Sequence, residues 1–244
     1  MNYSKLCNTY TFKHDFTENY EPKDLFYLHI PKTGGTLIEN MFFHHKIGAF
    51  TEPHKWDLLE VDSKIIQSKW HIPPRHINNL DFRKVIPFTS IRDPIDRIIS
   101  EYTWEPESNT EINTWIINAI NKHKLDEKIY DYHLEPQVSY IKDKFGNKMP
   151  YENMILCDSK NFVNNILKFA KKYNIRIIDY EKSIPSKTSL PHPIHKTPQY
   201  LNTRHTNKQD YSKLRDKLTP YTINYIKNYY EEDFKLYEMV KLYN

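Results

Sequence analysis

The 244-residue chain has few cysteines, few glycines and no long apolar run. The two cysteines, Cys7 and Cys157, have no C-x-x-C partner. Their number excludes a disulfide framework, leaves room for one bridge at most, and favours a reducing compartment. Residues 1–16 lack the apolar core of a signal peptide, and no run of about 18 apolar residues is present to span a bilayer. We therefore expect a soluble, cytoplasmic protein without a membrane span.

The chain also lacks dense blocks of basic residues. Its 35 Lys and Arg residues against 31 Asp and Glu residues leave a formal net charge of +4. A charge of this size permits an anionic cofactor or an acidic glycan but does not resemble a dedicated nucleic-acid surface. No set of Cys and His residues has zinc-finger spacing. We expect neither a nucleic-acid partner nor a metal.

No internal repeat or interdomain linker divides the chain, so residues 1–244 are expected to form one domain with an irregular leader at 1–23. Short apolar segments rich in β-forming residues alternate with segments of helical spacing. This alternation predicts an α/β fold of three layers, in which helices flank a central, mostly parallel sheet. The expected strands are residues 25–30, 85–91, 154–157 and 175–178. Four helices are expected over residues 56–68, 109–125, 161–173 and 220–234. Two more are expected to begin near residues 36 and 94.

Two of the four glycines in the chain are adjacent, at Gly34 and Gly35. They follow the apolar strand 25–30 and precede residues with helical spacing from Leu37 onward. Glycine permits a backbone geometry in which consecutive N–H groups turn toward one point, at the positive end of the helix that follows. An anion is expected at that point.

Three polar residues of this loop support an anion site. Lys32 adds a mobile positive charge, and Thr33 and Thr36 add hydroxyl donors, which makes the segment a P-loop-like phosphate cradle. The spacing is not G-x-x-x-x-G-K-[ST], which disfavours a kinase-type Walker loop.

The second expected strand, 85–91, leads into a well-specified helix. Pro87 lacks an N–H group, so regular pairing of the strand is expected to begin after it. Asp93 is a good N-cap, and Pro94 suits the first helical position.

This helix is expected to have one apolar face and one polar face. Asp93, Arg97 and Ser100 share the polar face at 100° per residue. For Arg97 we expect an i, i+4 ion pair with Asp93 on a solvated surface.

Two segments together resemble a known family. HIPKTGGT, residues 29–36, closely resembles the 5′-phosphosulfate-binding loop of sulfotransferases that use 3′-phosphoadenosine 5′-phosphosulfate (PAPS), especially the carbohydrate branch with heparan sulfate 2-O- and 6-O-sulfotransferases. SIRDPIDRIISEY, residues 90–102, resembles that family's 3′-phosphate-binding segment. The resemblance implies an enzyme that moves a sulfuryl group from PAPS to a hydroxyl acceptor, a saccharide or glycan, and releases adenosine 3′,5′-bisphosphate.

The resemblance also implies which residues bind the cofactor. The segment LNTRHTNK, residues 201–208, resembles the family's late basic loop over the nucleotide, within a Pro-rich stretch at 183–210 that we expect to be an active-site loop. HLEPQVSYI, residues 133–141, resembles a family segment near the acceptor or cofactor and adds Gln137 as a candidate. The implied cofactor-binding residues are Lys32, Thr33, Gly34, Gly35, Thr36, Leu37, Arg92, Ser100, Arg204 and Lys208.

In the same family a histidine before the 3′-phosphate segment acts as the general base. His71, on a loop stiffened by Pro73 and Pro74, matches best by position, and His54 is the second candidate. Lys32 is then expected to offset charge on the leaving phosphate oxygen, and this scheme requires no metal. Two other functions stay open: a non-catalytic nucleotide- or glycan-binding module on the same fold, and a P-loop nucleotide kinase, which the missing Walker spacing disfavours.

Overall fold

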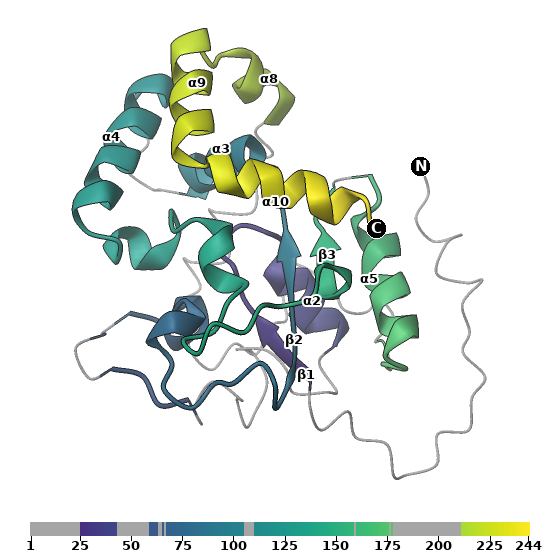
Figure 1. Ribbon diagram of the computed structural model, residues 1–244. Coiled ribbons are helices and arrows are strands. Elements are labelled where there is room, and N and C mark those ends of the chain that lie inside the picture. The colour runs from purple at the N-terminus through teal and green to yellow at the C-terminus, as the bar shows by residue number, and fades with distance from the viewer. Residues whose placement is uncertain are drawn as a thin grey trace, which may run out of the picture.

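The computed structural model describes residues 25–42, 59–62, 65, 67–104, 110–158, 160–175, 177 and 211–244. At its centre is a parallel sheet of three strands, with β2 between β1 and β3 (Figure 1). The strands are β1 (Leu25–Leu28), β2 (Ile86–Ile91) and β3 (Met154–Leu156). The predicted α/β class and the first three predicted strands are confirmed.

The two faces of the sheet belong to two different hydrophobic cores, because side chains alternate along a strand. On one face Leu25 and Tyr27 pack with helices α2 (Gly35–Met41) and α5 (Phe162–Lys172). On the other face Phe26 and Leu28 share a core with helix α10 (Glu231–Lys241). Helices therefore cover both faces of the sheet in the described part of the chain.

A third hydrophobic core joins four helices beyond the end of the sheet, as Figure 1 shows. They are α3 (Pro94–Trp104), α4 (Ile112–Leu125), α8 (Tyr211–Asp216) and α9 (Pro220–Tyr229). Asp93 starts α3 as predicted, because its Oδ1 accepts hydrogen bonds from the N–H groups of Ile95 at 2.9 Å and Asp96 at 3.0 Å. The helix predicted over 109–125 is confirmed as α4.

The single C-terminal helix predicted from Pro220 onward is wrong, because the chain forms two helices that meet at Tyr230. Tyr230 has φ −105° and ψ 28°, its ring is buried, and its hydroxyl donates to the Leu134 carbonyl at 2.7 Å. Tertiary packing of this aromatic side chain thus coincides with a break that helical periodicity does not reveal.

Two further predictions of secondary structure are wrong. No helix covers residues 59–62, where Val61 instead pairs with Ile77 in an antiparallel bridge. No strand forms at Ile175 or Ile177. The N–H group of Ile175 donates to the Ala170 carbonyl at 2.8 Å after a left-handed Asn174, so this apolar residue closes the end of α5 rather than extending the sheet.

The expectation that β2 pairs only after Pro87 is also wrong, since β2 begins at Ile86 and Pro87 lies opposite Phe26 of β1. Pairing with β3 begins only at Thr89, so Pro87 lies where β2 has one neighbouring strand. Its carbonyl accepts a hydrogen bond from Asn153 Nδ2 at 3.1 Å, outside the ladder.

Among the described helices, none is long and apolar enough to cross a membrane. Cys157 is a free thiol whose pKa burial raises to about 12, and Cys7 lies outside the described residues. The leader 1–23, the stretch 183–210, His54, Arg204 and Lys208 also lie outside them.

Candidate active site

Close packing surrounds both glycines at the junction of the loop 29–34 with α2, where Gly34 ends the loop and Gly35 begins the helix. Gly34 has φ +85°, and a Cβ there would lie 2.8 Å from Phe162 Cζ and 3.2 Å from Cys157 Sγ. A Cβ on Gly35 would lie 2.7 Å from His29 Nε2 and 2.8 Å from the Tyr27 hydroxyl. The glycine pair is therefore required by close packing of the loop as well as by backbone conformation.

The polar residues of the loop have different surroundings. The Thr33 side chain is fully buried, donates to the Ile30 carbonyl at 2.8 Å and shares a hydrogen bond of 2.8 Å with Ser90 Oγ, so this hydroxyl is used inside the fold. Thr36 is exposed, whereas Leu37 is half-buried and packs on the core beneath. Of the two predicted hydroxyl donors, only Thr36 is therefore at the surface of the loop.

Lys32 and Arg92 are brought together although they are 60 residues apart in the chain. Arg92 Nη1 donates to the Lys32 carbonyl at 3.0 Å, and Lys32 Nζ lies 4.2 Å from the centre of the Trp104 ring. Lys32 has a left-handed backbone with φ 67°, a conformation that occurs where surrounding contacts hold a residue in place. Two positive side chains therefore lie at the glycine loop.

The Gln137 side chain fixes the backbone of Arg92 through two hydrogen bonds. Its Oε1 accepts from the Arg92 N–H at 3.0 Å, and its Nε2 donates to the Arg92 carbonyl at 2.9 Å. Gln137 is itself fully buried, and its N–H donates to Asp233 Oδ2 at 2.8 Å. Ser100, the other residue predicted for this site, lies on α3 and is 6% exposed.

Arg97 does not lie on a solvated face, so that prediction is wrong. The residue is 3% exposed and donates three hydrogen bonds to carbonyls: from Nε to Pro31 at 3.0 Å, from Nη1 to Glu135 at 2.8 Å, and from Nη2 to His133 at 2.8 Å. The planar guanidinium can satisfy several acceptors at once, which a lysine cannot do in this geometry. Arg97 therefore joins the glycine loop to the segment that carries His133.

His71 forms a histidine–carboxylate pair. Its Nδ1 lies 2.8 Å from Asp131 Oδ2, and Asp131 Oδ1 accepts from the Ser68 N–H at 2.8 Å. Burial lowers the pKa of His71 to about 3, despite the hydrogen bond to Asp131. A neutral imidazole that donates Nδ1–H to this carboxylate keeps a lone pair on Nε2, as a proton acceptor must.

Two more histidines pack against His71, and each has its own carboxylate. The ring centres of His71 and His133 are 4.7 Å apart, and those of His71 and His29 are 5.4 Å apart. The Nδ1 atom of His133 lies 2.7 Å from Glu101 Oε2, and that of His29 lies 2.7 Å from Glu39 Oε1. The His29 imidazole packs directly against Gly35, with Nε2 2.7 Å from where a Cβ would lie. Because the His71 ring packs on His29, the cluster formed by His29, His71 and His133 places His71 near the glycine loop.

The backbone that carries Asp131 is strained. Tyr130, Asp131 and Tyr132 all have positive φ, at 55°, 54° and 62°. Left-handed backbone costs a non-glycine residue on the order of 1–3 kcal/mol and is concentrated at functional sites. The strain allows Asp131 to reach His71, and the carboxylate of Asp131 has its pKa held below the ordinary value because the hydrogen bonds from His71 and Ser68 outweigh burial.

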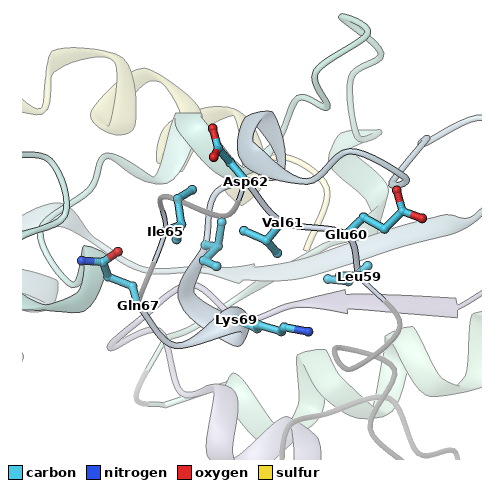
Figure 2. Close-up of a pocket in the computed structure, with 8 residues that line it drawn as sticks. Leu59, Glu60, Val61, Asp62, Ile65, Gln67 and Lys69 are labelled. Atoms are coloured by element: carbon cyan, nitrogen blue, oxygen red, sulfur yellow. The ribbon is translucent and has the colours of Figure 1, made fainter.

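A cavity of about 420 Å³ adjoins the segment that leads to His71 (Figure 2). Figure 2 shows Val61 and Ile65 toward the middle of the lining and the carboxylates of Glu60 and Asp62 toward its edge. Neither His71 nor a residue of the glycine loop lines it, although Lys69 and Ile72, which flank His71 in the chain, both do. Its lining consists of Leu59, Glu60, Val61, Asp62, Ile65, Gln67, Lys69 and Ile72.

The α/β fold has a glycine loop after a parallel strand, two cations at that loop and an oriented histidine next to it, an arrangement suited to an enzyme that transfers an anionic group. A family model described as "Sulfotransferase family" matches residues 14–240, so the chain belongs to the sulfotransferase family. This membership supports sulfuryl transfer as the general reaction. The comparisons with curated proteins and with solved structures find no match.

The structure thus brings together Lys32, both glycines, Arg92 and His71, while His54, Arg204 and Lys208 lie outside the described residues. Sequence reasoning did not identify three residues of the histidine cluster: His133, Asp131 and Glu101. Their separations of 60 and 32 residues from their partners give no periodic signal. Two segments of the family resemblance gave a hint: residues 133–141 begin with His133, and residues 90–102 contain Glu101.

Proposed function

We propose that the protein is a PAPS-dependent sulfotransferase that acts on a carbohydrate hydroxyl, with His71 as the general base. One observation carries the proposal: the oriented, uncharged imidazole of His71 lies against His29, and His29 in turn abuts Gly35 of the anion loop. A base and an anion site are therefore adjacent, as transfer to a hydroxyl requires.

The glycine loop supplies the contacts proposed for the 5′-phosphosulfate. The residues are Gly34, Gly35 and Thr36 through their N–H groups, and Lys32 through its charge. Leu37 follows them, and its own N–H donates to the Gly34 carbonyl at 3.1 Å, so its proposed part is to hold the loop in shape. Thr33 shapes the loop through its buried hydroxyl. PAPS itself would supply the activated sulfuryl group, and the residues around it supply position and charge.

Arg92 and Ser100 are proposed to bind the 3′-phosphate. Arg92 carries a planar charged fork suited to phosphate oxygens, and Gln137 holds its backbone by two hydrogen bonds. Arg204 and Lys208 are proposed as additional nucleotide contacts from the loop 183–210.

Each side chain has a defined part in the proposed transfer. Nε2 of His71 removes the proton from the acceptor hydroxyl while that oxygen attacks sulfur, and Asp131 stabilises the imidazolium that forms. Lys32 offsets the negative charge that gathers on the departing phosphate oxygen. The sulfur–oxygen bond to phosphate breaks as the new one forms, and adenosine 3′,5′-bisphosphate leaves.

The cavity that Lys69 and Ile72 help to line is consistent with a carbohydrate acceptor. Gln67, Lys69 and the carboxylates of Glu60 and Asp62 surround apolar side chains, a combination that can bind a sugar through both its hydroxyls and its C–H faces.

A transfer assay with PAPS and a panel of neutral, amino and acidic saccharides tests the proposal, with His71→Ala and His54→Ala measured in parallel. A general base contributes about 10²–10⁴-fold, so His71→Ala should lower kcat by that order and leave the affinity for adenosine 3′,5′-bisphosphate nearly unchanged. A severe loss in His54→Ala with near-normal His71→Ala would move the base to His54. Nucleotide binding without transfer to any acceptor would instead favour a binding module.

A further inference from the structure

His71, Asp131 and His133 form a group suited to a metal ion. Each offers one ligand atom, and these atoms all lie within 4.8 Å of one another. Two imidazoles and one carboxylate, with a remaining position for water, are a ligand set that Zn²⁺ accepts in proteins. Two ligand atoms on a tetrahedral zinc ion are separated by roughly 3.4 Å, so modest side-chain rotations would suffice.

The neighbours of these side chains are placed as metal-site neighbours usually are. Glu101 lies 2.7 Å from Nδ1 of His133, which leaves Nε2 of His133 as the nitrogen with a lone pair. Asp131 is held through its second oxygen by the Ser68 N–H at 2.8 Å. A carboxylate behind a ligating histidine and a hydrogen bond behind a ligating carboxylate fix the orientation of both ligands.

Charge and access also suit a cation. Glu101 is 2% exposed, and it adds negative charge close to the group without needing to bind the ion. The side chains of His71, His133 and Asp131 retain 13%, 14% and 33% of their exposure, so a hydrated ion can reach them from solvent.

The left-handed backbone at residues 130–132 is a further, independent indication. Three consecutive positive φ angles bring the Asp131 carboxylate to His71. Without a metal ion, the side-chain contact that this strained backbone makes possible is one hydrogen bond, between Asp131 and His71. Strained backbone at a cluster of potential ligands is typical of sites that bind something.

We propose that His71, Asp131 and His133 bind one transition-metal ion, with Zn²⁺ as the expected species, and that the bound ion inhibits transfer. The inhibition rests on the proposed function: a His71 held by the metal has lost the freedom to accept the proton of a hydroxyl. The binding itself does not depend on that function.

Binding is tested with the full chain after removal of metal by a chelator. Titration calorimetry with Zn²⁺ should show one equivalent bound, and Co²⁺ should give the visible absorption of a four-coordinate ion. Asp131→Asn and His133→Gln should each weaken Zn²⁺ binding at least about tenfold, and Glu101→Gln, which removes no ligand, should weaken it about 10- to 100-fold.

His76→Gln is the matched control, because His76 also pairs with a carboxylate, Glu127 at 3.1 Å, but lies outside the group. It should bind Zn²⁺ like the parent, and circular dichroism should show that every variant is folded. Absence of stoichiometric binding, or equal binding by Asp131→Asn, His133→Gln and the parent, would overturn the metal site.

The transfer assay separates this proposal from the proposed function. Zn²⁺ at saturating concentration should abolish turnover reversibly, and the chelator should restore it. Transfer in a protein that does not bind Zn²⁺ would refute the metal site alone, whereas binding without any effect on turnover would refute the inhibition.

Discussion

Replacement of Arg97 by lysine tests the buried connection between the glycine loop and the histidine segment. Arg97 donates to three carbonyls, from Pro31, Glu135 and His133, at 2.8–3.0 Å. A lysine keeps the charge but has one nitrogen, which can reach one of these acceptors. Two charge-assisted hydrogen bonds are then lost at about 1.5–3 kcal/mol each. Allowing for partial relaxation, we expect the free energy of unfolding to fall by about 3–5 kcal/mol.

Urea unfolding followed by circular dichroism measures this loss. With an m value of about 2–3 kcal/mol/M, the midpoint should move down by roughly 1–2 M. Arg215→Lys is the matched control, because Arg215 contacts Asp96 and Asp93 on the same helix while its side chain is 43% exposed. Exposed ion pairs contribute about 0–1 kcal/mol, so this variant should stay near the parent. Equal midpoints for the two variants would refute the contribution assigned to Arg97.

Four further outcomes are expected. Arg92→Ala should weaken binding of adenosine 3′,5′-bisphosphate by about ten- to a hundredfold but hardly change that of adenosine 5′-monophosphate, and calorimetry that finds the two nucleotides bound equally by the parent would reject the 3′-phosphate site. Lys32→Ala should chiefly lower kcat, since its charge is needed most as the leaving oxygen becomes anionic; a rise in the KM for PAPS at parental kcat would make it a binding residue only. Gly35→Ala should abolish nucleotide binding while the far-ultraviolet spectrum is kept, because a Cβ would meet buried side chains at 2.7–2.8 Å; normal nucleotide affinity would show that the loop can adjust. Cys157 is half-buried, and its pKa is raised to about 12 by desolvation, so it should resist alkylation at pH 8 until urea unfolds the chain; rapid labelling of Cys157 in the native protein would contradict the raised pKa.

Several elements could be predicted from the sequence because their causes are local. The Gly34-Gly35 pair, the Asp93 cap and the apolar spacing of α4 each act over a few residues, and the structure has a loop, a helix start and a helix at those positions. Parallel pairing of β1 and β2 also followed from alternation of strands and helices.

Other features depended on partners far away in the chain. Arg97 has helical spacing from Asp93, which suggests a surface ion pair, but its three acceptors lie 36 to 66 residues away. The break between α9 and α10 likewise coincides with the burial of Tyr230 against Leu134. Neither partner is visible in local periodicity.

The sequence by itself determined the glycine turn after β1 and the start of α3, because glycine conformation and helix capping act within a few residues. The choice of His71 came from the family resemblance and from its place beside Pro73 and Pro74, and its role as the base stays a prediction. Only the tertiary structure decided what surrounds His71: Asp131 as its partner, and His29 and His133 as its neighbours. Those contacts arise where three segments meet in space: His29 just after β1, the short helical turn Lys69–His71, and the turns that follow α4. Side chains that meet in this way are held together by burial and hydrogen bonds, which carry no periodic trace in the sequence.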